Sequence, residues 1–152
     1  MGRATVVASL VVALFVGAAA PAHGQTRKEW AKAANAICKR EYANVHSAID
    51  EATTNPPQTV RQWTRWVDKM VTPMKRMRRD LGALDRPPND RASIAKVLGL
   101  LDRSLAEFEL ARTATIKRSA AAYQLHMKRA LVLGARIDAL FKLLGARVCA
   151  EG

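Results

Sequence analysis

The sequence predicts an all-α protein: an up-down-up-down four-helix bundle with one disulfide, after an N-terminal signal peptide. Apolar residues recur every three or four positions through four stretches of the chain, the spacing of one face of an α-helix. No stretch alternates apolar and polar residues with the period of two that is typical of a β-strand. The chain also has two cysteines, one early and one three residues from its end.

The first 24 residues have the pattern of a signal peptide. Arg3 precedes an apolar run of 17 residues, Ala4–Ala20, and small residues follow it. Cleavage after Gly24 fits this pattern best, and cleavage after Ala22 is the close alternative. An uncleaved membrane anchor is a further alternative, but such anchors are usually longer and richer in Leu and Ile. We therefore expect export, followed by one mature domain of residues 25–152.

The mature chain of 128 residues is the size of a single domain and is strongly basic. It contains 24 Lys and Arg against 13 Asp and Glu, a net charge of +11 with His neutral. Such a charge attracts anionic surfaces such as an envelope polymer, lipid headgroups or nucleic acid, although it can also serve only to keep a protein soluble. An exported chain seldom meets nucleic acid, so we do not expect that partner.

Cys38 and Cys149 are expected to form the disulfide, because exported proteins meet oxidising conditions. Metal ligation is the alternative, but neither cysteine is accompanied by a CxxC pair or a His cluster. Since Cys38 falls within the first predicted helix, the C-terminal tail must fold back against that helix.

The first helix is expected to begin after Thr26, because Thr26 and Glu29 have the spacing of a capping box. It should run to about Thr53, before Asn55-Pro56-Pro57. The second helix begins at Val60, and its apolar residues alternate spacings of three and four, which predicts a buried seam. These seam residues are Val60, Trp63, Val67, Met70, Met74, Met77, Leu81 and Leu84.

Pro73 lies within the second helix, where we expect a kink rather than two separate helices. The opposite side of the helix carries the densest line of cations in the chain, which we call the basic stripe. We expect this stripe to contact an anionic ligand. Its residues are Arg61, Arg65, Lys69, Arg76 and Arg79.

Asn89 or Asp90 is expected to cap the third helix. No Gly or Pro separates the third and fourth helices, so one very long helix is conceivable. A break within 113–119 gives a more compact protein, and Ser119 can then cap the fourth helix. Gly145 is expected to end that helix in a left-handed conformation.

The sequence contains few residue sets that indicate chemistry. Two histidines without clustered carboxylates make a poor zinc site, and methionines on one helix face indicate core packing more than copper or haem ligation. Two tryptophans beside arginines resemble single-strand nucleic-acid sites, but one of them belongs to the seam. We therefore expect no metal and no cofactor. The residues considered are His46, His126, Met70, Met74, Met77, Trp63 and Trp66.

Three short motifs resemble those of a broad group of uncharacterised exported bacterial helical proteins. They are Ala34-Asn-Ala-Ile-Cys38, Leu81-Gly-Ala-Leu84 followed by Pro87-Pro88, and Leu144-Gly-Ala-Arg-Val-Cys149. The resemblance implies the helical bundle and the disulfide, and it implies no activity. Many members of that group are acidic and lipid-anchored, whereas this chain is basic and has no lipid-attachment cysteine, so a shared partner does not follow.

These observations predict an exported, non-enzymatic binding or structural module at the cell envelope that contacts an anionic polymer or membrane surface. The alternative is a small all-helical exported enzyme resembling chorismate mutases, with a pocket where Arg and carboxylate groups converge. The chain has the residue types for such a pocket but few glutamines, namely Gln58, Gln62 and Gln124 in its helical region.

Overall fold

The computed structural model describes residues 25–151, so the predicted signal peptide lies outside the described residues. The described part contains no strand, and its four long helices confirm the all-α prediction. Two short 3-10 helices, η1 (Pro88–Asp90) and η2 (Arg147–Ala150), precede α3 and follow α4. No helix within this part is both long and apolar enough to cross a membrane. The four helices are α1 (Arg27–Thr54), α2 (Val60–Gly82), α3 (Arg91–Ile116) and α4 (Ala120–Leu143).

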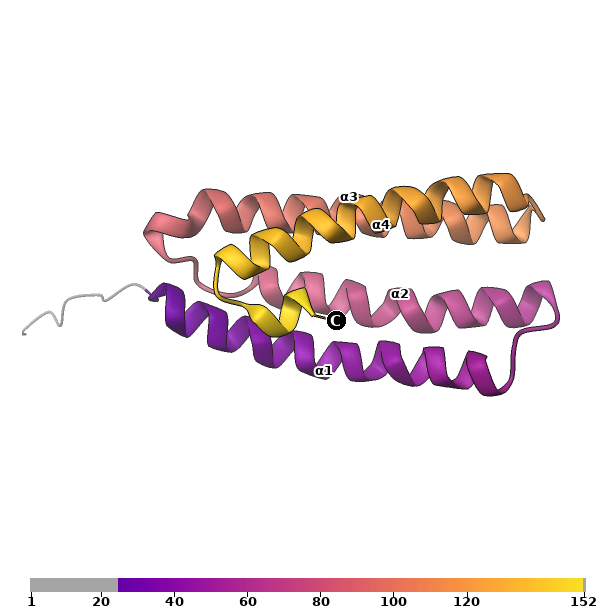
Figure 1. The fold of residues 1–152 in the computed structure, drawn as a ribbon, viewed down its shortest axis with the longest axis horizontal. Coiled ribbons are helices and arrows are strands. Elements are labelled where there is room, and N and C mark those ends of the chain that lie inside the picture. Colours follow the sequence, from indigo (N-terminus) through magenta and orange to yellow (C-terminus); the bar gives the residue numbers. More distant parts are fainter. Residues whose placement is uncertain (1–24, 152) are drawn as a thin grey trace, which may run out of the picture.

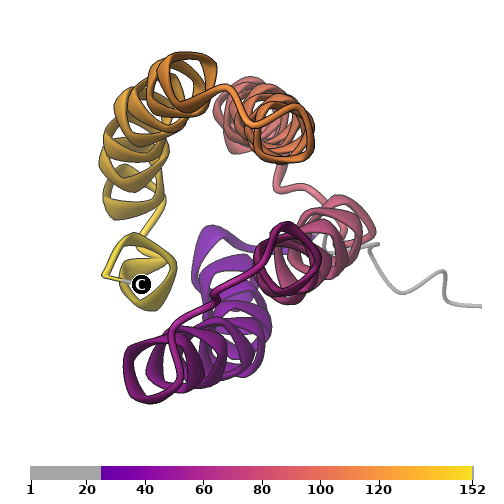
Figure 2. The same cartoon turned by 90° about the vertical axis from the view of Figure 1, so that its right-hand side faces the viewer.

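Successive helices run in opposite directions, and each packs against the next in the chain (Figure 1). The up-down-up-down bundle is therefore confirmed. In contrast, α1 and α4 are joined mainly through η2, which packs against both of them. Figure 2 looks along the bundle and shows this C-terminal segment between α4 and α1. The tail thus completes the ring of helices.

The disulfide between Cys38 and Cys149 fixes this tail to α1. The two sulfur atoms are 2.04 Å apart and the two Cα atoms 5.1 Å apart. The tail also donates a hydrogen bond of 2.9 Å from the backbone N–H of Val148 to the side-chain oxygen of Asn35. Gly145, with φ of 79°, provides the left-handed turn that follows α4. The predicted return of the tail to the first helix is confirmed.

The tightest part of the core lies at the end of the bundle where the disulfide is. The largest side chains that are almost wholly buried there are Trp30, Leu81, Ile94, Val97, Phe141 and Leu144. From the middle of the bundle toward the other end, Met70, Met74 and Met127 are only half-buried, and Trp63 is 37% exposed. Only some of the predicted seam residues are therefore fully buried. The physical reason is that η2 fills the space between α1 and α4 near one end only (Figure 1).

The helix boundaries mostly follow the predicted signals. The capping box of Thr26 and Glu29 is present, and α2 continues through Pro73 as a single helix. Asp90 and Ser119 occupy the N-cap positions of α3 and α4, but neither side chain forms the expected capping hydrogen bond. Asp90 is instead buried, and its carboxylate accepts hydrogen bonds from the guanidinium group of Arg27.

The break between α3 and α4 falls inside the predicted segment. α3 ends at Ile116 and α4 begins at Ala120. Arg118 adopts a positive φ of 55° in this turn, a conformation that costs a non-glycine residue some free energy. Arg118 thus occupies the left-handed position where a glycine is usual, so no glycine marks this boundary in the sequence.

Candidate interface with an anionic surface

The basic stripe lies on the outer side of α2, and most of its charge is already matched. Three of its five cations form ion pairs with carboxylates of α1 or α2, while Arg61 and Arg65 form none within residues 25–151. The three pairs are Lys69–Glu51, Arg76–Glu41 and Arg79–Asp80.

Arg76, in the basic stripe, pairs with the buried carboxylate of Glu41 on α1. This carboxylate is 2% exposed, and it accepts hydrogen bonds of 2.6 Å from Arg40 and 3.0 Å from Arg76. Burial alone would raise the pKa of Glu41, but the hydrogen bonds from the two guanidinium groups outweigh it and hold the pKa below its usual value. Arg76 therefore joins α2 to α1 and has less charge to offer an external ligand.

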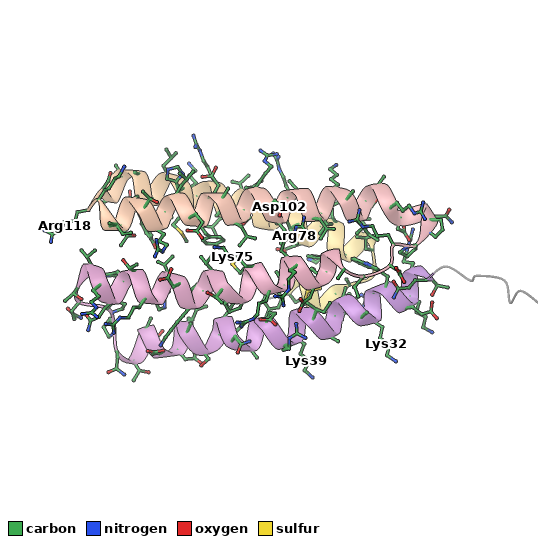
Figure 3. The ribbon with its side chains drawn as sticks, turned by 180° about the vertical axis from the view of Figure 1, so that it is seen from behind. Lys32, Lys39, Lys75, Arg78, Asp102 and Arg118 are labelled. Atoms are coloured by element: carbon green, nitrogen blue, oxygen red, sulfur yellow. A yellow bond between two sulfur atoms is a disulfide. The ribbon has the colours of Figure 1, made fainter. Side chains whose placement is uncertain are left out.

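The carboxylates of α3 and α4 all face other helices. Asp102 pairs with Arg78 at 2.8 Å, and the two side chains point toward one another between α2 and α3 (Figure 3). Glu109 pairs with Lys75 of α2 at 2.5 Å, and Glu107 lies 2.7 Å from the ring of His126. The fourth is Asp138: burial raises the pKa of Tyr42 on α1, and the charge of Asp138 adds to that shift.

On the outer side of α3 and α4, the exposed charged side chains of the described residues are cations. Lys96 and Arg103 of α3 and Arg136 of α4 line one open groove of about 610 Å³. Leu100 and Leu140 line it too, and no carboxylate does. Three like charges around one groove repel each other, so an anion placed there would be attracted by all three.

The same face continues along both helices, because residues seven positions apart return to one side of a helix after two turns. Leu110 follows Arg103 by seven positions, while Arg129 and Leu143 flank Arg136 at the same spacing. Leu125 and Val132 precede the groove residue Ala139 by fourteen and seven positions. The exposed residues of this outer α3–α4 face are Lys96, Arg103, Leu110, Leu125, Arg129, Val132, Arg136 and Leu143.

None of the four cations of this face forms an ion pair with another described residue. The face has four cations against the five of the basic stripe, but fewer of its charges are neutralised by carboxylates of the described residues. Its positive field is directed toward solvent, whereas the field of the stripe is partly cancelled by Glu41, Glu51 and Asp80.

The other residues singled out in the sequence are dispersed. His46 is exposed on α1, whereas His126 is on α4. Met77 is buried in the core. No group of three His, Cys, Asp or Glu within residues 25–151 could hold a metal. Trp66 donates its indole N–H to the backbone carbonyl of Ala48, and Trp63 packs edge-on against it.

Two of the glutamines considered for an enzymatic pocket, Gln58 and Gln62, lie together at the start of α2. The side-chain oxygen of Gln62 accepts hydrogen bonds from the backbone N–H groups of Gln58 and Thr59, and so caps the start of α2. Gln124 is exposed on α4.

The chain matches no protein-family model, no curated protein and no solved structure. The resemblance to exported helical proteins therefore stays a prediction.

Sequence reasoning missed the outer α3–α4 face, although a signal for it was present. Lys96 and Arg103, like Arg129 and Arg136, are seven residues apart. What singles out the face is the position of the acidic residues. The partners of Asp102 and Glu109 depend on how α3 packs against α2, which the sequence pattern alone does not give.

Proposed function

We propose that the protein is an exported, non-enzymatic binding module that docks onto an anionic component of the cell envelope through the outer α3–α4 face. One observation carries the proposal: Lys96, Arg103, Arg129 and Arg136 share this face, and no carboxylate among residues 25–151 pairs with any of them. The common chemistry of the partner is a dense array of phosphate or carboxylate groups. The disulfide supports a site of action outside the cytoplasm, because reducing conditions disfavour such bonds.

The energetics favour a reversible surface contact. All four cations are exposed, so they keep much of their hydration until contact and bring little desolvation cost. Each Lys or Arg close to an anionic surface contributes about 1 kcal/mol. Because salt screens charges over roughly 10 Å at an ionic strength of 0.1 M, the affinity should fall steeply as salt is added.

Salt dependence tests the proposal directly. The purified protein is titrated against two anionic probes, polyphosphate and vesicles containing phosphatidylglycerol, at increasing sodium chloride concentrations. We expect binding to at least one probe that weakens with each increase in salt. Affinity that ignores ionic strength, or no binding to either probe, would remove the proposal.

Charge reversal at matched positions locates the contact. Replacing Arg103, Arg129 and Arg136 with Glu should weaken binding by more than a hundredfold, because each change removes an attraction and adds a repulsion. The control variant carries Lys28→Glu, Lys32→Glu and Lys39→Glu on α1 and has the same net charge. We expect it to lose much less affinity.

A third variant tests the basic stripe. It carries Arg61→Glu, Arg65→Glu and Arg79→Glu, which leaves Arg76 in place to hold Glu41. If this variant loses binding while the α3–α4 variant keeps it, the ligand contacts the stripe, and the outer α3–α4 face is not the interface.

A further inference from the structure

Large apolar side chains are exposed mainly on the two helices that form the outer α3–α4 face. Six of the nine such side chains within residues 25–151 belong to α3 or α4. Four of these six lie on the face itself: Leu110, Leu125, Val132 and Leu143. Leu143 is 73% exposed, and the other three are about half exposed. Exposed apolar groups concentrated on one face indicate an interaction surface.

Cations and apolar side chains lie side by side on this face, and two rows at intervals of seven residues each have two cations followed by a leucine. On α3 the order is Lys96, Arg103, Leu110, and on α4 one row reads Arg129, Arg136, Leu143, each at intervals of seven residues. Leu125 and Val132 form the neighbouring row on α4. The face is thus amphipathic within itself, with positive groups next to apolar groups and the four carboxylates of α3 and α4 directed to other helices.

The bilayer surface is the partner that satisfies both kinds of side chain. A soluble anionic polymer would neutralise the cations but would leave the leucines in water. A bilayer of anionic lipid offers phosphate groups to the cations and, a few ångströms deeper, hydrocarbon to the leucines. The groove lined by Lys96, Arg103 and Arg136 gives a lipid headgroup a place between the two helices.

We propose that the outer α3–α4 face docks on an anionic phospholipid bilayer, with α3 and α4 lying along the membrane surface. Leu110, Leu125, Val132 and Leu143 enter the acyl-chain boundary, and the four cations contact headgroup phosphates. This proposal rests on the proposed function and names the membrane as its anionic component. The opposite side of the bundle, formed by α1, then faces away from the lipid (Figure 2).

Apolar substitution separates membrane insertion from simple charge attraction. A variant with Leu125→Gln, Val132→Gln and Leu143→Gln keeps every charge of the protein. Its affinity for vesicles of phosphatidylglycerol and phosphatidylcholine should fall by at least about tenfold for each lost apolar contact. Its affinity for polyphosphate should stay within about twofold of the original protein, because polymer binding depends on charge alone.

Leu131 provides the matched control. It is 70% exposed and lies on the same helix as Leu143. Because the two residues are twelve positions apart, their side chains point in directions that differ by about 120° around the helix axis. Leu131→Gln should therefore leave vesicle binding unchanged, while Leu143→Gln alone lowers it about tenfold. Circular dichroism of each variant confirms that the helices are intact.

A depth measurement gives a second readout that does not depend on affinity. Tryptophan is introduced in separate variants as Leu143→Trp and Leu131→Trp, and vesicles carry phospholipid with brominated acyl chains. We expect the bromine to quench the additional fluorescence of Leu143→Trp but not that of Leu131→Trp. Equal quenching of the two variants would contradict the proposed orientation.

The outcomes distinguish the two proposals. Binding to polyphosphate with no binding to anionic vesicles would identify a polymer partner and overturn the membrane proposal alone. If the triple Gln variant binds vesicles as tightly as the original protein, the contact is purely electrostatic. This result would also overturn the membrane proposal alone. Failure to bind either probe would overturn the proposed function as well.

Discussion

Tyr42 of α1 donates a hydrogen bond of 2.8 Å from its hydroxyl group to the backbone carbonyl of Cys149. Burial raises the pKa of Tyr42 to about 12, and the negative charge of Asp138 adds to the shift. The hydroxyl group therefore stays protonated at neutral pH and remains a donor. The C-terminal segment is thus held to α1 by this hydrogen bond as well as by the disulfide.

Tyr42→Phe should destabilise the protein by about 1 to 2 kcal/mol, because the carbonyl of Cys149 loses its donor in a partly buried place. The loss is measured as a lower midpoint of urea unfolding. Tyr123→Phe is the control, since the hydroxyl group of Tyr123 forms no hydrogen bond within the described part of the chain. Equal midpoints for Tyr42→Phe and the original protein would show that the bond contributes nothing.

The double variant Cys38→Ala and Cys149→Ala should unfold at a much lower urea concentration. The disulfide closes a loop across 111 positions, and in the chain-entropy model such a link stabilises by roughly 4 to 5 kcal/mol. A reducing agent should lower the midpoint of the original protein and leave that of the variant unchanged. A midpoint that is insensitive to reduction in both proteins would mean that the tail is held by its other contacts.

The helices and the disulfide could be predicted because their signals are local or unique. The capping box at Thr26 and the prolines after Asn55 set the bounds of α1, and two cysteines allow only one pairing. Even the break after Ile116 followed from poor helix propensity and the expected compactness. In each case the decisive physics acts within a few residues or leaves no alternative.

The ion pairs could not be predicted, because they depend on how neighbouring helices are aligned. Glu41 falls on the inner face of the first helix, between Cys38 and Val45. A charge in such a buried position needs a partner, so the sequence did indicate that one exists. Nothing in the spacing identified Arg40 and Arg76 as that partner. Asn89 or Asp90 was expected to cap α3, and the pairing of Asp90 with Arg27 was missed for the same reason, because it joins two distant parts of the chain.

Glu41→Gln should destabilise the protein by about 2 kcal/mol at neutral pH, because it removes a charge-assisted acceptor shared by Arg40 and Arg76. The folded state lowers the pKa of Glu41, so its contribution is complete above the ordinary value of 4.5 and is lost as the pH falls through the lower folded value. Urea unfolding of the two proteins across this range should show the difference shrinking toward acid.

Glu151→Gln is the control for that experiment, since Glu151 is exposed and forms no ion pair within residues 25–151. Its unfolding midpoint should match that of the original protein throughout. A difference between Glu41→Gln and the original protein that stayed constant with pH would assign the loss to packing rather than to charge.

Asp138→Asn should have the opposite effect and stabilise the protein at neutral pH. Burial raises the pKa of Asp138, and Lys142 only partly opposes this. The folded state therefore disfavours the ionised carboxylate, and this cost is relieved as the pH falls through the raised pKa toward the ordinary value of 3.8. Asparagine never ionises, so the variant should have the higher urea midpoint at pH 7 and lose its advantage in acid.

Asp50→Asn, at an exposed position of α1, should show no such gain. A lower midpoint for Asp138→Asn at pH 7 would mean that attraction to Lys142 outweighs the cost of burial.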